Sequence, residues 1–285
     1  TPILLAAIGE LVVERAGVLN LGVEGMMITG AVCGYIVGHE TSSAFAGFLG
    51  AAAGGAAVAA IFGVLTLVLL TNQVATGLAL TLFGVGLAAM VGQGYTTDTE
   101  VLVPKLAIPL LSDIPALGHI LFNHDLVVYA SIALVVAVGA FLRYTRGGMI
   151  LRAVGENHEA AHALGYNVRL IRFGAILFGG ACAGLGGAYI SLVRVPQWTD
   201  GITAGAGWIA LAIVVFAGWK PGRLVVGAYL FGGVTALQLN LQATGLAIPV
   251  EYLSMSPYIA TILVLVLLSG SRGPGSLGKT FHASR

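Results

Sequence analysis

The sequence predicts an all-α fold, a polytopic transmembrane helical bundle of about 8 to 10 membrane helices. Of its 285 residues 58% are hydrophobic and only 9% are charged, whereas soluble domains carry about a quarter charged residues. Several stretches also reach the roughly 20 apolar residues that a helix needs to cross the hydrocarbon core of a bilayer. A water-soluble globule is therefore excluded, and we expect one transmembrane domain over residues 1–285.

Four helices are expected in the N-terminal half of the chain. They are residues 3–13, 22–38, 44–70 and 74–94. The third contains no charged or amide side chain, so nothing in it opposes burial in lipid. A polar stretch, residues 9–25, joins the first two and predicts a broken helix at membrane depth. Because the chain starts at Thr1 inside an apolar run, we also expect a further N-terminal segment before it.

Five helices are expected in the C-terminal half. They are residues 126–143, 170–193, 205–219, 224–242 and 252–270. Within the second of these, residues 179–187 are mostly glycine and alanine. Small residues four apart let helix backbones approach closely in lipid, so we expect a tightly packed bundle. An external loop is expected at about 95–125 and a flexible tail at about 272–285.

The basic residues set the orientation, because cytoplasmic loops carry the excess of positive charge. Ten of the thirteen fall in three segments, which we assign to the cytoplasmic side. They are Arg143, Arg146, Arg152, Arg169 and Arg172 in one connection, Lys220 and Arg223 in a second, and Arg272, Lys279 and Arg285 in the tail. The net charge of +1 and the scattered basic residues indicate no nucleic-acid partner.

Residues 158–162 read H-E-x-x-H, a pattern that on a helix can place two imidazoles on one zinc ion, as in a metalloprotease. Three observations oppose this interpretation. The motif lies in the most basic loop rather than in a span, and no neighbouring segment offers a third ligand. Asn157 as N-cap and Gly165 as C′ residue also leave only about two helical turns. Such a short helix needs a docking partner to be stable, so we expect a docking element and no metal, with a membrane zinc metalloprotease as the alternative.

Residues 273–280 read G-P-G-S-L-G-K-T and fit the phosphate-binding pattern G-x-x-x-x-G-K-[ST]. That loop works because a strand precedes it and a helix follows, whose N-terminus holds the phosphates. Here a membrane helix precedes the motif and five residues follow it. We expect no nucleotide there and no cofactor bound by this chain. The spans also contain no oriented nucleophile and base, so no covalent chemistry is expected.

Polar residues at membrane depth are costly and by default mark a solute pathway. The candidates are Asn20, Glu24, Asn72, Gln73, Trp208 and Phe216. The first two lie in the broken stretch, where they line a cavity or else cap the helix break. The two amides at 72–73 can read donors and acceptors on a nucleobase or sugar, or simply cap a helix. The aromatic pair can stack on a base, although aromatic residues at helical spacing also fit packing.

Several sequence blocks carry a family resemblance. L-R-A-V-G-E-N at 151–157, E-A-A at 159–161 and A-L-G-Y-N-V at 163–168 resemble the cytoplasmic coupling segment of ABC transporter permeases of the branched-chain amino acid, simple sugar and nucleoside group. Members commonly have proline where this chain has His158. The residues that the resemblance assigns to coupling, over a helix at about 156–165, are Gly155, Glu156, Asn157, His158, Glu159, Ala160, Ala161, Leu164 and Gly165.

Other blocks resemble the nucleoside branch of this group. G-E-L at 9–11 with E-R-A-G-V-L-N-L-G-V-E-G-M-M at 14–27 resembles its N-terminal signature. N-Q-V at 72–74 with G-L-A-L at 77–80 resembles a mid-chain segment. A further match is formed by T-A-G at 203–205, G-W-I-A-L-A at 207–212 and F-A-G-W-K-P at 216–221. The blocks occur in order and cover most of the chain.

The resemblance implies the permease subunit of a bacterial ABC importer in the inner cell membrane, acting by alternating access on a purine or pyrimidine nucleoside. It implies a second permease subunit, similar or identical, and a solute-binding protein outside. ATP and Mg would bind a separate ABC ATP-binding subunit. Alternatives are a simple sugar or branched-chain amino acid permease. A channel or secondary transporter is a further alternative, which would need neither the ATPase nor the short helix.

Overall fold

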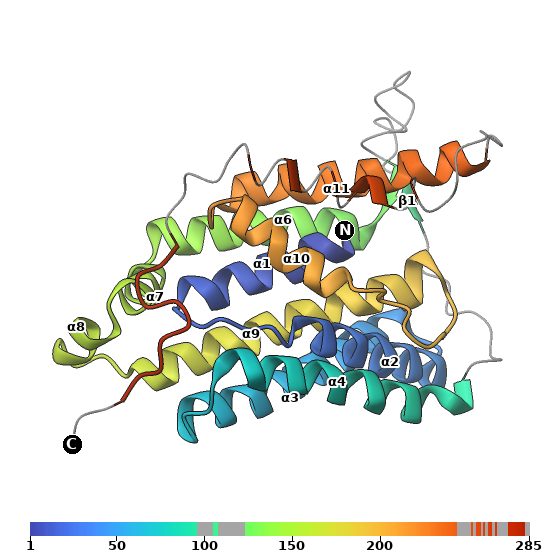
Figure 1. The fold of residues 1–285 in the computed structure, drawn as a ribbon. Coiled ribbons are helices and arrows are strands. Elements are labelled where there is room, and N and C mark those ends of the chain that lie inside the picture. The colour runs from blue at the N-terminus through green and yellow to red at the C-terminus, as the bar shows by residue number, and fades with distance from the viewer. Residues whose placement is uncertain are drawn as a thin grey trace.

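The residues that the computed structural model describes are 1–95, 105–107, 123–243 and 273–282, with a few single positions between 252 and 266. Figure 1 shows a bundle of helices that run side by side, so the expected all-α, multi-pass architecture is confirmed. Within the described part of the chain, the strands form one short antiparallel pair, β1 (Lys105–Ala107) and β2 (Asn123–Asp125).

Four helices form the N-terminal half, close to where the sequence predicts them. They are α1 (Pro2–Arg15), α2 (Val23–Thr41), α3 (Ala44–Gly63) and α4 (Gln73–Gly92). Short turns extend the last two, a π-helical turn η1 (Val64–Val68) and a 3₁₀ turn η2 (Gln93–Tyr95). The predicted break separates α1 from α2. Residues 16–22 leave the helix there, and Gly17 adopts a φ of +83°.

Among the described residues, the C-terminal half adds three long helices and three short ones. They are α6 (Leu126–Tyr144), α7 (Arg146–Glu156), α8 (His158–Ala163), α9 (Val168–Tyr189) with a π-helical turn η3 (Ile190–Arg194), α10 (Ala206–Phe216) and α11 (Pro221–Ala243). α10 ends before the predicted boundary at 219, because Gly218 and Trp219 adopt positive φ angles. α7 lies where the sequence predicts only a cytoplasmic connection, because its basic residues oppose a membrane span. The predicted helix at 252–270 and most of the external loop lie outside the described residues.

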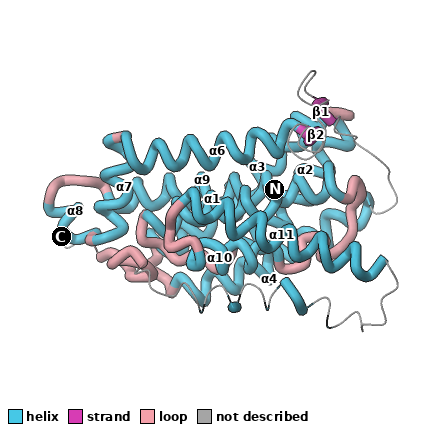
Figure 2. Tube along the Cα trace, turned by 90° about the horizontal axis from the view of Figure 1, so that it is seen from above, coloured by secondary structure: helices cyan, strands magenta, loops and turns pink. Residues whose placement is uncertain are grey.

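Five of the described helices are long and apolar enough to cross a membrane. They are Ala44–Val68, Gln73–Tyr95, Leu126–Tyr144, Val168–Arg194 and Pro221–Gln242. Figure 1 places α7, α8 and the C-terminal residues at one end of the bundle and β1 at the other. Figure 2, from above, shows the same separation. We call the end with α7, α8 and residues 273–282 the basic end, because the basic connections of the sequence lie there.

α9 packs against α1, α2 and α3 through small residues, as the glycine pattern predicts. A Cβ added at Gly184 would overlap the carbonyl oxygen of Ala51 in α3, and one at Gly30 in α2 would overlap the Cα of Gly184. On the α1 side, a Cβ at Gly9 would lie 2.6 Å from the Cβ of Cys182. The helix backbones are therefore in direct contact, and dispersion between them supplies the packing energy that hydrophobicity cannot supply in lipid.

We expect Gly184→Ala to lower the free energy of unfolding by about 3 kcal/mol, because the added methyl must push apart backbones that cannot rearrange locally. Gly174→Ala on the same helix is the matched control, since a Cβ there meets no described atom within 4 Å. It should be neutral or stabilising by up to about 1 kcal/mol, because alanine favours a helix over glycine. Thermal unfolding in detergent measures both, and equal unfolding midpoints would contradict the proposed packing.

Candidate functional site

Glu24 joins the first turns of two helices that begin within the bundle, α2 and α10 (Figure 1). Its carboxylate accepts hydrogen bonds from the backbone N–H of Gly205 at 3.0 Å and of Gly207 at 2.7 Å. The hydroxyl of Thr203 donates a third bond at 2.5 Å. The carboxylate thus caps the start of α10, whose free N–H groups carry partial positive charge.

The Glu24 contact is tightly packed and leaves the side chain only 6% exposed. A Cβ added at Gly207 would lie 2.6 Å from the Cα of Glu24, so α2 and α10 touch through their backbones. Both carboxylate oxygens already accept hydrogen bonds. Glu24 therefore acts as a helix cap, which is one of the two roles that the sequence allows. Direct contact with a solute stays a prediction.

Asn20 is fully buried in the break between α1 and α2. Its side-chain oxygen accepts a hydrogen bond from Gly22 N at 2.9 Å, which closes a tight turn. Its amide nitrogen and its backbone N donate to the carboxylate of Glu10 at 3.5 and 3.4 Å. The break is thus folded back onto α1 by a polar network at the centre of an apolar bundle.

Asn72 and Gln73 stand next to each other at the start of α4 but face different surroundings. Asn72 is an exposed N-cap whose oxygen accepts from Ala75 N at 3.0 Å. Gln73 is only 3% exposed, and its Oε1 accepts from Leu19 N in the helix break at 2.8 Å. Its Nε2 is buried and finds no hydrogen-bond partner among the described residues. An unpaired buried donor is costly, so a polar ligand atom would gain a hydrogen bond there.

Trp208 and Phe216 lie on α10, and both are half-buried against the main hydrophobic core. A Cβ added at Gly227 of α11 would lie 2.7 Å from the ring of Phe216, so this ring fills the space between α10 and α11. The ring of Trp208 lies beside the first turn of α10, near Gly205. The structure therefore brings Asn20, Gln73 and Glu24 to the break and the start of α10, and it places Phe216 in helix packing.

At the basic end, α7 packs against the end of α1 with no side chain between them. A Cβ added at Gly155 would overlap the carbonyl oxygen of Arg15. The Arg15 side chain donates from Nη2 to the carbonyl oxygen of Trp219 at 2.9 Å. The indole of Trp219 in turn donates to the Glu14 carboxylate at 2.5 Å. The end of α1 is thereby fixed both to α7 and to the turn between α10 and α11.

Arg172, near the start of α9, is completely buried and connects three segments. Its Nε donates to Ala16 O in the helix break at 3.1 Å, and its Nη1 donates to Lys279 O at 3.1 Å. Its Nη2 lies 3.3 Å from Nδ1 of His158 in α8. From the sequence, Arg172 is expected only to add positive charge to a cytoplasmic connection. The signal for a buried role is that Arg172 is the one charged residue within the helix predicted at 170–193.

Residues 273–282 pack against α7 and α8, whereas the sequence suggested a flexible tail. The backbone N of His158 donates to the hydroxyl of Ser276 at 3.2 Å. The rings of His158 and His162 lie edge-on against Phe281 at centroid distances of 5.4 and 5.2 Å, and Phe281 is 5% exposed. The tail holds its place because it supplies hydrogen bonds to the ends of α7 and α8 and buries one aromatic ring.

The H-E-x-x-H residues form α8, a six-residue helix. Asn157 caps it by accepting a hydrogen bond from Ala160 N at 3.0 Å, and Gly165 follows with a φ of +88°, so both predicted ends are confirmed. The imidazole of His158 faces the guanidinium of Arg172, which a metal cation would have to displace. Within the described ranges, no group of three or more His, Cys, Asp or Glu side chains is placed to hold a metal ion.

The G-x-x-x-x-G-K-T segment uses its backbone donors on the protein itself. Gly275 N donates to the Glu156 carboxylate at 3.3 Å, and Ser276 N donates to Gly155 O at 2.8 Å. In a phosphate-binding loop such N–H groups would point at the nucleotide. The motif here connects the tail to the end of α7.

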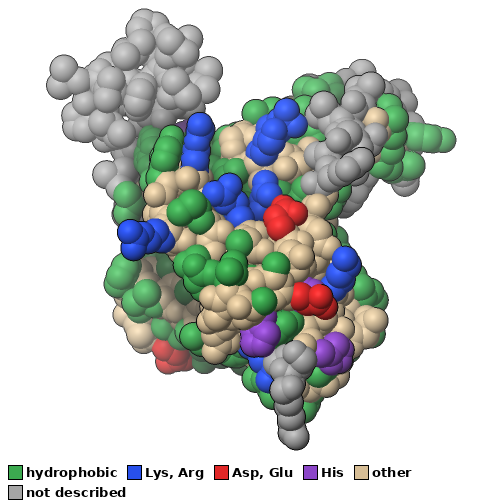
Figure 3. All heavy atoms as spheres, turned by 90° about the vertical axis from the view of Figure 1, so that its left-hand side faces the viewer, with side chains coloured by type: hydrophobic (Ala, Val, Ile, Leu, Met, Phe, Trp, Pro, Cys, Tyr) green, Lys and Arg blue, Asp and Glu red, His purple; other side chains and the backbone are tan. Residues whose placement is uncertain are grey.

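The predicted coupling residues divide between two faces. Those buried against the bundle are Gly155, His158 and Ala161. Those exposed are Glu156, Asn157, Glu159, Ala160, Leu164 and Gly165. Leu164 is 78% exposed, so a large apolar side chain projects from the basic end. Figure 3 shows this end face, with basic side chains gathered over one part of it.

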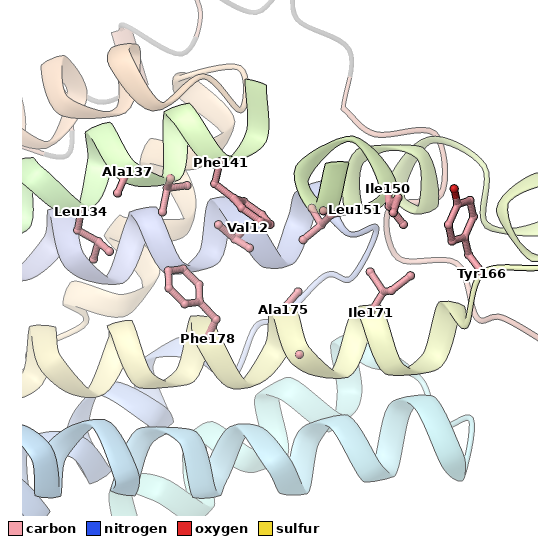
Figure 4. Close-up of a pocket in the computed structure, with 13 residues that line it drawn as sticks. Val12, Leu134, Ala137, Phe141, Ile150, Leu151, Tyr166, Ile171, Ala175 and Phe178 are labelled. Carbon is pink, nitrogen blue, oxygen red and sulfur yellow. The ribbon is translucent and has the colours of Figure 1, made fainter. Parts of the chain in front are cut away.

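A cavity of about 580 Å³ lies between α6, α7 and α9 and is floored by α1 (Figure 4). Leu134 and Phe141 of α6 line it together with Ile171 and Phe178 of α9. Its described lining is apolar except for the hydroxyl of Tyr166. A polar solute would lose its water there without gaining hydrogen bonds, so we do not place the solute pathway in this cavity.

Comparisons with known proteins cover nearly the whole chain. Residues 1–268 match the family described as the branched-chain amino acid transport system permease component. The TsgC13 protein of Haloferax volcanii, provisionally named a glucose ABC transporter permease, is 40% identical over 93% of this chain and 87% of its own length. No solved structure matches the chain.

Two further relatives are named for nucleosides. The nucleoside ABC transporter permease NupC of Lactococcus lactis is 33% identical over 95% of this chain and 89% of its own. The guanosine ABC transporter permease NupQ of Bacillus subtilis is 33% identical over 93% of this chain and 87% of its own. The helix break, α8 and Arg172 lie inside residues 1–268, whereas the tail at 273–282 lies beyond them. This multi-pass chain therefore belongs to the branched-chain amino acid transport system permease family and is a permease of an ABC importer.

Proposed function

We propose that this chain passes a nucleoside or a similar small polar solute inward by alternating access, driven by a separate ATP-binding subunit. The observation that supports this most is a continuous set of contacts from the exposed helix α8 to the polar centre of the bundle. It starts at His158, passes through Arg172 and reaches the helix break at Ala16. The break then leads to Glu24 and the start of α10.

The short helix α8 is the proposed contact with the ATP-binding subunit. A six-residue helix is too short to be stable by itself, and here α7, Arg172 and the tail hold its inner face. Its outer face stays free to enter a groove in a partner. When ATP closes two such partners, α8 moves, and its contacts through His158, Arg172 and the helix break carry the displacement to both internal helix starts.

The rest of the assembly is proposed on the same basis. A second permease subunit, similar or identical, would complete the solute pathway, and a solute-binding protein would deliver the solute from outside. ATP and Mg would bind the ATP-binding subunit, and this chain would bind no cofactor.

The helix break is the proposed place of solute contact. The Nε2 of Gln73 is a buried donor with no partner in the described part of the chain. A nucleoside offers acceptors on both its base and its ribose. Trp208, half-buried at the start of α10, supplies an aromatic face for stacking. Asn20, Glu24 and Phe216 then shape this region through contacts within the protein.

The names of the relatives support two solute classes. NupC and NupQ are named for nucleosides and match over nearly the whole chain, as the sequence blocks of the nucleoside branch predict. The higher identity to TsgC13 favours a simple sugar as the second candidate. Hydroxyl groups of a sugar would also accept from the Nε2 of Gln73, which has no partner among the described residues. Hydrogen bonding alone therefore does not separate the two solute classes.

Purification of this chain from its native membrane tests the proposal. We expect an ATP-binding subunit and a solute-binding protein to copurify. The ATPase rate of the complex is then measured with guanosine, uridine, glucose or leucine present. Stimulation by a nucleoside supports the proposal, and stimulation by glucose alone assigns the chain to sugars. Recovery of the chain without any ATP-binding subunit would overturn the coupling role.

We expect Leu164→Glu to weaken binding of the ATP-binding subunit about 30-fold, because a buried leucine contributes about 2 kcal/mol and the new charge would be desolvated. Leu170→Glu is the matched control, since Leu170 is 67% exposed but lies on α9, outside the coupling segment. Binding of the purified subunit to each variant in nanodiscs is the measurement. Equal losses in the two variants would show that charge at the basic end, and not α8, sets the affinity.

Acidification should loosen α8. Burial, followed by the positive charge of Arg172, lowers the pKa of His158 below its ordinary value; Glu159 acts against this shift and Lys279 adds to it. The folded chain therefore binds this proton less readily than the unfolded chain, and stability falls as the pH drops through about 6.5. Thermal unfolding at about pH 7.5 and about pH 5.5 should show a smaller pH effect in His158→Gln than in the wild type. An equal effect in both would rule out His158 as the cause.

A further inference from the structure

A second cavity, of about 600 Å³, lies at the basic end. The described basic side chains that line it are Arg15, Arg143, Arg152 and Lys220. They come from the ends of α1 and α6, from α7, and from the turn before α11. No acidic side chain is among its described lining residues. The cavity therefore brings together four positive charges that lie far apart in the sequence.

One of these cations has a buried donor without a hydrogen-bond partner in the described part of the chain. The Nε of Arg152 is buried and makes no hydrogen bond to any described residue. Arg15 lies near this side chain, and the carboxylate of Glu156 attracts the Arg15 guanidinium more strongly than Arg152 repels it. The guanidinium of Arg143 rests over the ring of Tyr144 at 5.5 Å. An anion in the cavity would accept charge-assisted hydrogen bonds from these cations, including one from the buried Nε of Arg152.

The remaining wall of the cavity is apolar and belongs mainly to α6. It includes Val136, Gly139, Ala140 and Leu142. From Val136 to Tyr144 this wall follows about 12 Å of helix, and these two end residues are 67% and 76% exposed. Because α6 is a candidate membrane span, the wall runs from the basic end toward membrane depth.

We propose that this cavity binds an anionic phospholipid, with the phosphate among the four basic side chains and an acyl chain along α6. Basic pockets between membrane helices on the cytoplasmic side suit anionic head groups. A free anion would leave the apolar wall of α6 uncovered, and a soluble subunit would not reach it. The bound phosphate would tie α1, α6, α7 and the turn before α11 together at the place where α8 connects to the helix break.

Native mass spectrometry of the purified permease complex tests this site, with phosphatidylglycerol or phosphatidylcholine titrated into a neutral detergent. We expect the wild type to retain phosphatidylglycerol about 100-fold more tightly than phosphatidylcholine. Replacing Arg143, Arg152 and Lys220 together by glutamine should weaken phosphatidylglycerol about 100-fold and remove the preference, because each nearby cation is worth about fivefold. Equal retention of both lipids by the wild type would overturn the proposal.

Arg223→Gln is the matched control, because Arg223 is an exposed cation in the first turn of α11 that does not line the cavity. It should change phosphatidylglycerol binding less than about twofold. If the triple variant does not fold, Arg152→Gln alone should weaken phosphatidylglycerol binding about fivefold, and unchanged binding in that variant would overturn the assignment.

Inorganic phosphate in excess tests whether the site takes a free anion instead of a lipid. If it displaces phosphatidylglycerol from the wild type, the site takes free phosphate and the lipid assignment is wrong.

Discussion

The buried guanidinium of Arg172 is the interaction on which the basic end depends. A buried cation costs several kcal/mol unless its donors are satisfied, and here three donor groups reach Ala16 O, Lys279 O and the His158 ring. Hydrogen bonds from a charged group contribute about 1.5 to 3 kcal/mol each, so the cation is stable only while all three segments are in place. The helix break, α8 and the tail are thereby made interdependent, although they lie far apart in the sequence.

Glu24 plays a comparable part in the centre of the bundle. Two helices that begin inside a membrane protein leave their first N–H groups without water. From the first turn of α2, the Glu24 carboxylate accepts hydrogen bonds from the N-cap residue of α10, Gly205, and from Gly207 in its first turn. Its negative charge also lies at the positive N-terminal end of both helices, so it favours both internal starts. The two polar networks therefore stabilise different regions: Arg172 holds the segments of the basic end together, and Glu24 stabilises the irregular backbone at the centre of the bundle.

Much of the fold could be predicted from the sequence because hydrophobicity, glycine spacing and capping are local signals. Residues 44–70 indicate a span by themselves, and Asn157 and Gly165 mark the ends of α8 within a few residues. The contacts of Arg172 could not be predicted in this way, since its partners at 16 and 279 are set by how the helices pack. The docking of Phe281 was missed for the same reason. At the proposed solute site, the sequence identifies Asn20, Glu24 and Gln73 as unusual, but only the structure shows that all three bond within the protein and that Nε2 of Gln73 has no partner among the described residues.

The direct backbone contact between Gly155 of α7 and Arg15 of α1 affects how motion passes between the two helices. Side chains between two helices act as soft spacers, because they can change rotamer and absorb a displacement. Here the carbonyl oxygen of Arg15 occupies the space where a Cβ would be, so backbone rests on backbone. Two backbones in direct contact cannot move closer, so a small displacement of α7 toward α1 should shift α1 by nearly the same distance. Because the stiffness of this contact comes from steric exclusion rather than from charge, the contact should transmit force equally well in any salt or pH that leaves the fold intact.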